Sequence, residues 1–74
     1  MIFDFVCKQI ALQMAVEESA IADNTPFEEI GVDPVELILI AMAVEEHFEI
    51  LLEDEQLERL LTVGDLVRLI EDEL

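Results

Sequence analysis

A helix start at Asp33 constrains the fold more than any other feature of this sequence. Asp33 is a good N-cap residue, Pro34 suits the first helical position, and Glu36 follows three residues after the cap, as in a capping box. Residues 37–44 (LILIAMAV) are then all apolar. Because no single face of a helix can hold this run, we expect the helix to be buried on more than one side and to continue to about Phe48.

Three further helices are predicted from apolar periodicity and capping signals. Residues 2–15 form the first, residues from about 54 to 60 form a short third, and the fourth begins at the capping box of Thr62 and Asp65. Residues 16–32 are expected to form a long ordered connection. The fold class is therefore predicted to be all-α, a four-helix bundle with a short third helix, folded as one domain over residues 1–74. Inward-facing side chains are expected at Phe3, Val6, Ile10, Met14, Val16, Ile21, Phe27, Ile30, Leu57, Leu60, Leu61, Val63, Leu66, Val67, Ile70 and Leu74.

The charge of the chain narrows the kinds of ligand that it can bind. Its 74 residues include 19 acids against three basic residues, for a net charge of −16, while 54% hydrophobic content is ample for a core. A field of this sign excludes nucleic acid and anionic membranes as direct ligands, because both are polyanions. It favours the basic surfaces of partner proteins, and a weak homodimer stays open.

The cysteine content and the N-terminus point to a cytoplasmic setting. Cys7 is the only cysteine, so the chain forms no internal disulfide. Residues 1–5 lack the basic start and long apolar stretch of a signal peptide. The apolar run 37–44 is too short to span a bilayer.

Several segments, in order and at matching spacing, resemble the acyl carrier protein family. The resemblance implies the four-helix carrier fold, and it implies a phosphopantetheine arm attached to a serine at the start of the second helix. In the family that serine lies in an Asp-Ser-Leu tripeptide, whereas the matching residues here are Asp33, Pro34 and Val35. The segments that carry the resemblance are Ile2-Phe3-Asp4, Val6, Ile10, 16–18 (VEE), 27–33 (FEEIGVD), 43–48 (AVEEHF), Asp54-Glu55 and 62–66 (TVGDL).

Pro34 leads to a specific prediction about the cofactor. Proline has no hydroxyl with which to form a phosphodiester, so phosphopantetheine is not expected as a cofactor. Ser19, Thr25 and Thr62 lie outside the family's context for attachment. The chain is therefore predicted to act as a non-covalent adaptor that docks onto partner proteins, among them acyl-handling enzymes. A structural interpretation of Pro34 is simple stabilisation of the helix start.

Candidate partner-binding residues lie on the second helix. The resemblance implies that its acids face basic enzyme surfaces, although a solvated face that keeps the protein in solution would look the same. Leu37 and Leu39 stand where the family usually has polar and acidic residues, and one of them is expected to be exposed as a binding surface or dimer contact. The full set of candidates is Asp33, Glu36, Leu37, Leu39, Glu45 and Glu46.

Two other function classes remain open at this point. One is a functional acyl carrier protein in fatty-acid, polyketide or related acyl metabolism. The other is an acidic mimic of nucleic acid, for which net charge is the only motivation. We do not expect an enzyme, because no nucleophile–base pair, catalytic carboxylate pair or phosphate loop is present. We also expect no metal site, since the acids around His47 match no ligand spacing.

Overall fold

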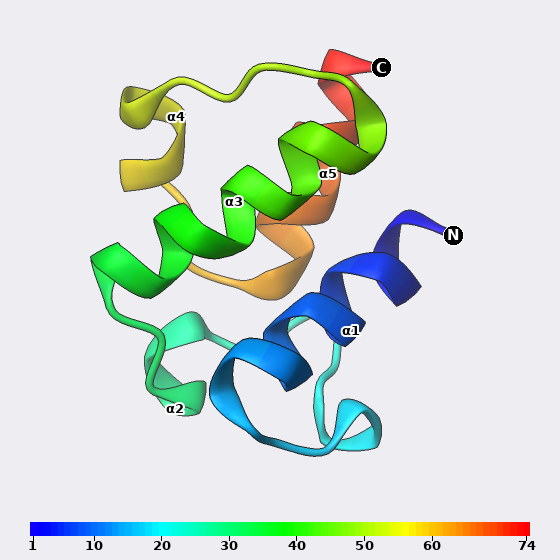
Figure 1. Ribbon diagram of the computed structural model, residues 1–74. Helices are drawn as coiled ribbons and strands as arrows, with labels where there is room; N and C mark the ends of the chain where they lie inside the picture. Colours follow the sequence, from blue (N-terminus) through cyan, green and yellow to red (C-terminus); the bar gives the residue numbers. More distant parts are fainter.

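The computed structural model describes all 74 residues, and every regular element in it is helical (Figure 1). The all-α prediction, a bundle with a short third main helix, is confirmed. Helix α1 lies against both α3 and α5, while the short α4 lies against α3. The elements are α1 (Ile2–Met14), the 3-10 turn η1 (Glu18–Ala20), α2 (Phe27–Ile30), α3 (Pro34–Phe48), α4 (Asp54–Glu58) and α5 (Val63–Glu73).

Helix α3 begins where the sequence predicts, because its first turn satisfies its own polar groups. The Asp33 carboxylate accepts the Glu36 N–H at 2.7 Å, and the Glu36 carboxylate accepts the Asp33 N–H at 3.0 Å. Pro34, at the first helical position, has no N–H that needs a partner. The helix ends at Phe48, and its C-cap Glu49 adopts a left-handed conformation with φ 57°.

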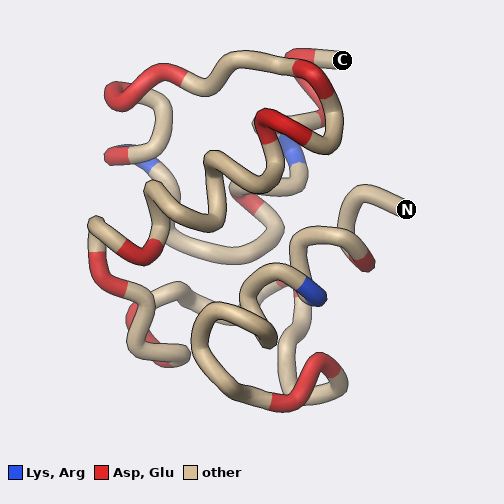
Figure 2. The backbone as a smooth tube through the Cα atoms, in the orientation of Figure 1, with Lys and Arg blue, Asp and Glu red and all other residues tan.

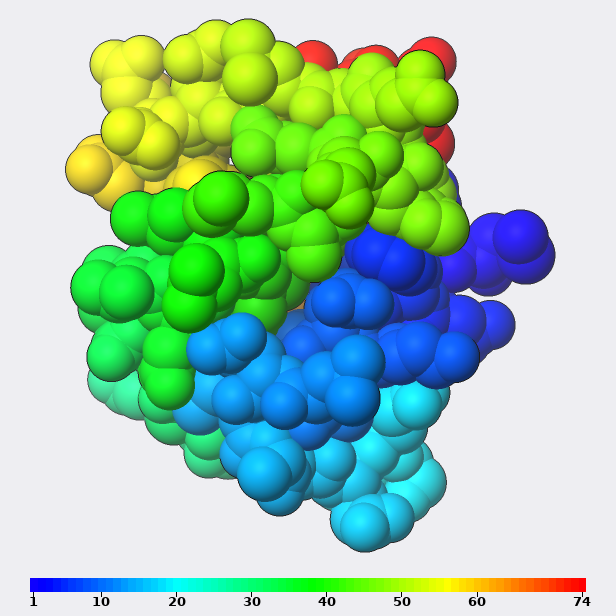
Figure 3. Space-filling model, viewed as in Figure 1, coloured from blue at the N-terminus to red at the C-terminus, as the bar shows by residue number.

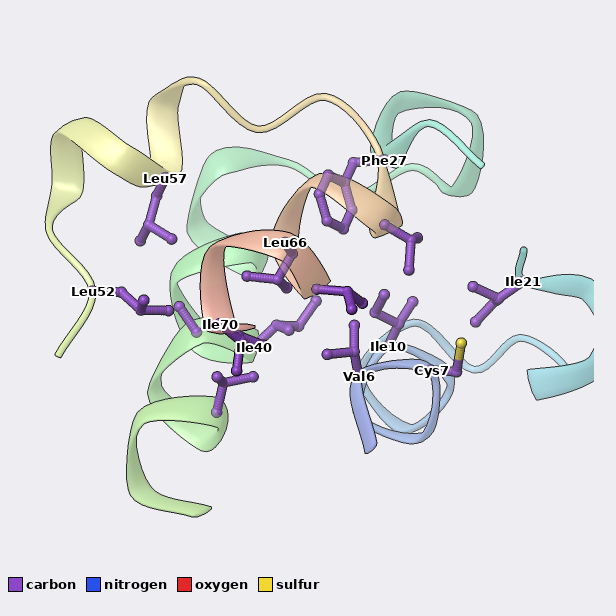
Figure 4. Packing of buried hydrophobic residues seen from close by; sticks show 14 residues of the cluster. Val6, Cys7, Ile10, Ile21, Phe27, Ile40, Leu52, Leu57, Leu66 and Ile70 are labelled. Atoms are coloured by element: carbon purple, nitrogen blue, oxygen red, sulfur yellow. The ribbon is translucent and has the colours of Figure 1, made fainter. Parts of the chain in front are cut away.

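The core is formed almost entirely by aliphatic side chains from all the main helices (Figure 4). Val6 and Ile10 of α1 meet Ile40 of α3 and Ile70 of α5, as their helical spacing predicts. The fourteen buried hydrophobic residues are Val6, Cys7, Ile10, Ile21, Phe27, Ile40, Ala41, Val44, Leu52, Leu57, Val63, Leu66, Val67 and Ile70.

Three residues that were predicted to face inward are exposed. Leu61 is 73% exposed, Leu74 is 66% exposed, and Val16, which follows the C-cap of α1, is 36% exposed. Helix α4 ends at Glu58, so Leu61 belongs to the connection before α5 and no longer follows the helical period. Leu74 is the last residue and lies just beyond the end of α5.

The connection between α1 and α3 is ordered, as predicted, and is fastened to the start of α5. The N–H of Phe27 donates to the Leu61 carbonyl at 2.9 Å, and the N–H of Val63 donates to the Thr25 carbonyl at 3.0 Å. This pairing holds the one-turn helix α2 beside the entry to α5. Gly31 ends α2 with φ 90°, a conformation that favours glycine, and turns the chain toward α3.

None of the helices has the length and apolarity that crossing a bilayer requires. Every helical element contains at least one acidic residue, and the chain has only three basic residues (Figure 2). Arg68 pairs with Asp23 at 3.6 Å and with Asp65 at 2.9 Å.

Candidate functional site

An apolar groove of about 530 Å³ opens beside the first turn of α3. It lies between α2, α3 and α4, so its walls come from segments that the fold brings together from three parts of the chain. Its lining residues are Phe27, Glu28, Val32, Asp33, Pro34, Leu37, Ile38, Asp54, Leu57, Glu58, Leu60 and Leu61.

The groove combines an apolar lining with acidic side chains. Phe27 and Leu57 are buried and close it toward the core, while the exposed Leu61 lies at its surface. The exposed acids Asp54 and Glu58 come from α4. An apolar chain could therefore be buried from water in this groove, whereas the acidic side chains would repel a free anion.

The first turn of α3 places Pro34 on this groove. Its pyrrolidine ring has no hydroxyl, so this side chain cannot form a phosphodiester. Only three side chains of the protein carry a hydroxyl group. Thr25 is buried and accepts the Ala22 N–H at 2.9 Å, while Thr62 accepts the Asp65 N–H at 3.1 Å as the cap of α5. Ser19, in η1, is exposed.

Three of the predicted partner-binding residues lie together at this end of α3. Asp33 is exposed and lines the groove, and Glu36 is held in the capping box with it. Leu37 is half-buried, lines the groove and packs against the core. Of the two leucines, it is therefore Leu39 that is exposed, at 45%.

The other two acidic candidates lie in the last turns of α3 and differ from each other. Glu46 is exposed. Glu45 is half-buried, and its carboxylate accepts the Leu52 N–H at 2.8 Å. Glu45 therefore has a structural role within the chain. The sequence of an acid-rich helix gives no sign of such a role.

Sequence reasoning did not identify most of the groove. Val32, Ile38 and Leu60 belong to separate segments, and only the fold brings them together. The available signal was the Gly31 turn, which places α2 and α3 close together. The exposure of the apolar residues Val35 and Met42 was also not predicted from the sequence.

Three ionisable groups, Cys7, Asp65 and Arg68, have altered pKa values, and none of them lies in the groove. The hydrogen bond to Asp65 raises the pKa of Arg68. Burial raises the pKa of the Cys7 thiol, with smaller contributions from Glu18 and Asp4. Hydrogen bonds from the Thr62 and Leu61 backbone, and then from Arg68, lower the pKa of Asp65. The structure contains no group of three or more His, Cys, Asp or Glu side chains that could hold a metal ion.

The fold and groove define a small helical domain of the carrier type. Residues 4–70 match the family model described as the phosphopantetheine attachment site. The acyl carrier protein of Wolinella succinogenes is 37% identical over 71 residues, covering 95% of this chain and 93% of the relative. That of Sulfurovum is 33% identical over 72 residues, covering 96% of each chain, and that of Helicobacter pylori is 35% identical over 72 residues, covering 96% and 92%. The chain therefore belongs to the acyl carrier protein family.

These similarities contradict two predictions made from the sequence. The match to a phosphopantetheine attachment family and to proteins named acyl carrier protein points to a carrier with that prosthetic group. The predictions of a non-covalent adaptor and of no cofactor are therefore wrong. Position 34 is a single residue, whereas the match to the family spans residues 4–70 and therefore outweighs it.

Proposed function

We propose that this chain is an acyl carrier protein of fatty-acid, polyketide or related acyl metabolism, with phosphopantetheine as its prosthetic group. It is a carrier and not itself an enzyme. The observation that carries the proposal is the apolar groove beside the first turn of α3, in a chain of this family. When bound, the prosthetic group supplies a flexible arm that ends in a thiol.

The groove gives the chain's own residues a defined part in this function. Leu37 and Ile38 on α3 and Leu57 on α4 present aliphatic surface to a chain that enters between them. Burial of that chain is favoured by about 0.8 kcal/mol for each CH₂ removed from water. The acids of α4 lie beside the apolar lining, so they favour an uncharged acyl chain over a free carboxylate.

The position of attachment is the unusual part of this proposal. We propose that Pro34 occupies the place of the family's serine, which is supported by its position directly after the N-cap Asp33 and at the groove. A phosphodiester then has to form on another hydroxyl. Thr25 is buried and the Thr62 hydroxyl caps α5, which makes the exposed Ser19 the first candidate.

The proposal is tested by loading the protein with its prosthetic group. The chain is incubated with coenzyme A and a promiscuous phosphopantetheinyl transferase, and its intact mass is measured before peptides are mapped. We expect the native chain to gain one phosphopantetheinyl group, on the peptide that contains Ser19, and Ser19→Ala to lose it.

The matched variant is Pro34→Ser, which places a hydroxyl at the helix start, on the wall of the groove. We expect this variant to accept a group at position 34. If an authentic acyl carrier protein is loaded in the same reaction and the native chain is not, the proposed function is wrong. An adduct on Thr25 or Thr62 would support the carrier function and move the site of attachment.

The partners that fit this function are acyl-handling enzymes with basic surfaces. The net charge of −16 supports this choice and disfavours nucleic acid. A reducing cytoplasm suits a chain whose only cysteine is a buried free thiol.

A further inference from the structure

A second hollow, of about 520 Å³, lies beside the C-terminal half of α1 and is separate from the groove. We name it the α1 hollow. Its lining residues are Lys8, Ala11, Leu12, Val16, Glu17 and Glu18. None of them lines the groove, whose lining belongs to residues 27–61. Figure 3 shows this part of the chain, coloured blue to cyan, uncovered on the front of the molecule.

The α1 hollow is formed by a sharp turn at the end of α1. Ala15 has φ 57°, a left-handed conformation, and the N–H of Val16 donates to the Ala11 carbonyl at 3.3 Å. The chain therefore folds back against the last turns of the helix. There Lys8, Ala11 and Leu12 share one face, at positions i, i+3 and i+4. Leu12 is 73% exposed and Val16 is 36% exposed, so both offer apolar surface to a ligand in the hollow.

The charges of the α1 hollow restrict the ligand that it can hold. Lys8 is its only basic side chain and forms no salt bridge, since the ion pairs of the chain involve only Met1 and Arg68. The carboxylates of Glu17 and Glu18 also line the hollow, so they repel an anion everywhere except beside Lys8. The ligand that fits has one anionic group next to a compact apolar part.

Ser19 lies one residue beyond the lining of the α1 hollow. Its turn η1 is held by the N–H of Ala20, which donates to the Glu17 carbonyl at 3.1 Å, and by the N–H of Ile21, which donates to the Glu18 carbonyl at 3.0 Å. The buried side chain of Ile21 anchors the turn to the core. The exposed Ser19 is therefore held beside the hollow. In Figure 1, η1 and the groove helix α4 lie at opposite ends of the molecule.

We propose that the α1 hollow seats the phosphate and pantoyl part of the prosthetic group when this group is attached to Ser19. Lys8 pairs with the single negative charge of the phosphodiester, while Leu12 and Val16 cover the two methyl groups of the pantoyl unit. This inference rests on the proposed function and adds binding residues that the groove does not contain. The hollow holds only the base of the arm, and the thiol end stays free.

Attachment to Ser19 favours the arm over a free ligand of the same chemistry. A short tether gives the attached group an effective concentration in the millimolar range. Weak contacts with exposed side chains such as Lys8 and Leu12 are then enough to hold the base of the arm. A free fatty acid, which also joins an anion to an apolar part, has no such advantage.

The inference is tested by NMR on the chain loaded from coenzyme A. The protein carries isotope labels on its Leu and Val methyl groups, whereas the prosthetic group is unlabelled. Isotope-filtered spectra then detect nuclear Overhauser effects (NOEs) between the pantoyl methyl protons and the protein. We expect NOEs to Leu12 and Val16, and none to Leu61, a leucine of the same 73% exposure that lines the groove instead.

Two pairs of variants separate the charged and apolar contributions. Lys8→Gln should weaken seating about two- to fivefold, which lowers the NOE intensities and shifts the phosphorus resonance of the phosphodiester. Arg59→Gln, at a basic residue outside the hollow, should change neither. Leu12→Asn should remove the NOE to Val16, while Leu51→Asn, at an exposed leucine after α3, should keep it. Circular dichroism confirms that all four variants are folded.

Several results would overturn the inference. One is loading on Ser19 without NOEs to Leu12 or Val16, and another is an equal effect of Lys8→Gln and Arg59→Gln. Loading on a different hydroxyl would also overturn it, although the carrier function would stand. A native chain that gains no mass would contradict the carrier function and this inference together. The mass measurement therefore distinguishes a failure of the seat from a failure of the proposed function.

Discussion

The side chain of Glu45 accepts a hydrogen bond of 2.8 Å from the backbone N–H of Leu52. This bond joins the last turns of α3 to the connection that leads into α4. Leu52 is buried, so its N–H has little access to water as an alternative partner. The bond therefore helps to position α4, which forms one wall of the groove.

Removing this acceptor should destabilise the fold. We expect Glu45→Ala to lower the free energy of unfolding by about 1 to 2 kcal/mol, because the N–H of Leu52 loses its partner. Glu46→Ala is the matched control, since its exposed side chain forms no hydrogen bond, and it should change stability by less than about 0.5 kcal/mol. Urea unfolding followed by circular dichroism measures both values. Equal values for the two variants would show that the bond has no energetic role.

The C-cap of α3 offers a substitution that should stabilise the protein. Glu49 has φ 57° and ψ 48°, a left-handed conformation that costs most residues roughly 1 to 2 kcal/mol and costs glycine very little. Its negative charge also lies at the negative end of the helix dipole. We therefore expect Glu49→Gly to raise the free energy of unfolding by about 1 kcal/mol. Glu49→Gln, which removes only the charge, separates the two causes in the same urea titration.

The helices could be predicted from sequence because their signals are local. The Asp33 and Glu36 capping box, and that of Thr62 and Asp65, each lie within one turn, and both form as expected. The core stripe of α5 follows the 3.6-residue period. The prediction failed at Leu61, where the helix had already ended.

The candidate site was less predictable, because it depends on contacts between distant segments. The bond from Leu52 to Glu45 spans seven residues and has no pattern in the sequence. The groove joins Phe27 of α2 to Leu57 of α4, a relation that only the packing of three helices creates. Leu37 and Leu39 are two residues apart and chemically identical, yet the helical geometry of α3 places Leu37 at the groove and leaves Leu39 exposed.

This difference between the two leucines allows the groove to be tested directly. We expect Leu37→Asn to weaken the binding of decanoyl-pantetheine about tenfold, because a polar side chain would face the apolar chain in the groove. Leu39→Asn should leave this binding unchanged, since Leu39 does not line the groove. Isothermal titration calorimetry measures both dissociation constants. Equal effects would show that the acyl chain does not bind between α2, α3 and α4.

The high net charge predicts that salt stabilises the fold. With 19 acids and three basic residues, repulsion between carboxylates opposes the compact state. The screening length falls from about 30 Å at 0.01 M salt to about 8 Å at 0.15 M, so most of this repulsion is lost over that range. We expect the midpoint of thermal unfolding to rise as NaCl is added. An unchanged midpoint would mean that the acids are too far apart to destabilise the protein.

Asp65 predicts a specific loss of stability in acid. Its carboxylate accepts the N–H groups of Leu61 and Thr62, each at 3.0 Å, and these bonds with Arg68 lower its pKa below the ordinary value of 3.8. The pKa of Asp65 is lower in the folded chain than in the unfolded chain. Its contribution to stability is therefore fully present above pH 3.8 and is lost as the pH falls through the pKa of the folded state.

Substitution isolates this contribution from the general effect of pH on an acidic protein. Asp65→Asn should be less stable than the native chain at neutral pH, and the difference in unfolding free energy should shrink as the pH falls below 3.8. Glu71→Gln, on the same helix and exposed, should track the native chain at every pH. Urea titrations at a series of pH values measure these differences. If the gap between Asp65→Asn and the native chain stays constant into strong acid, the hydrogen bonds of Asp65 do not depend on its charge.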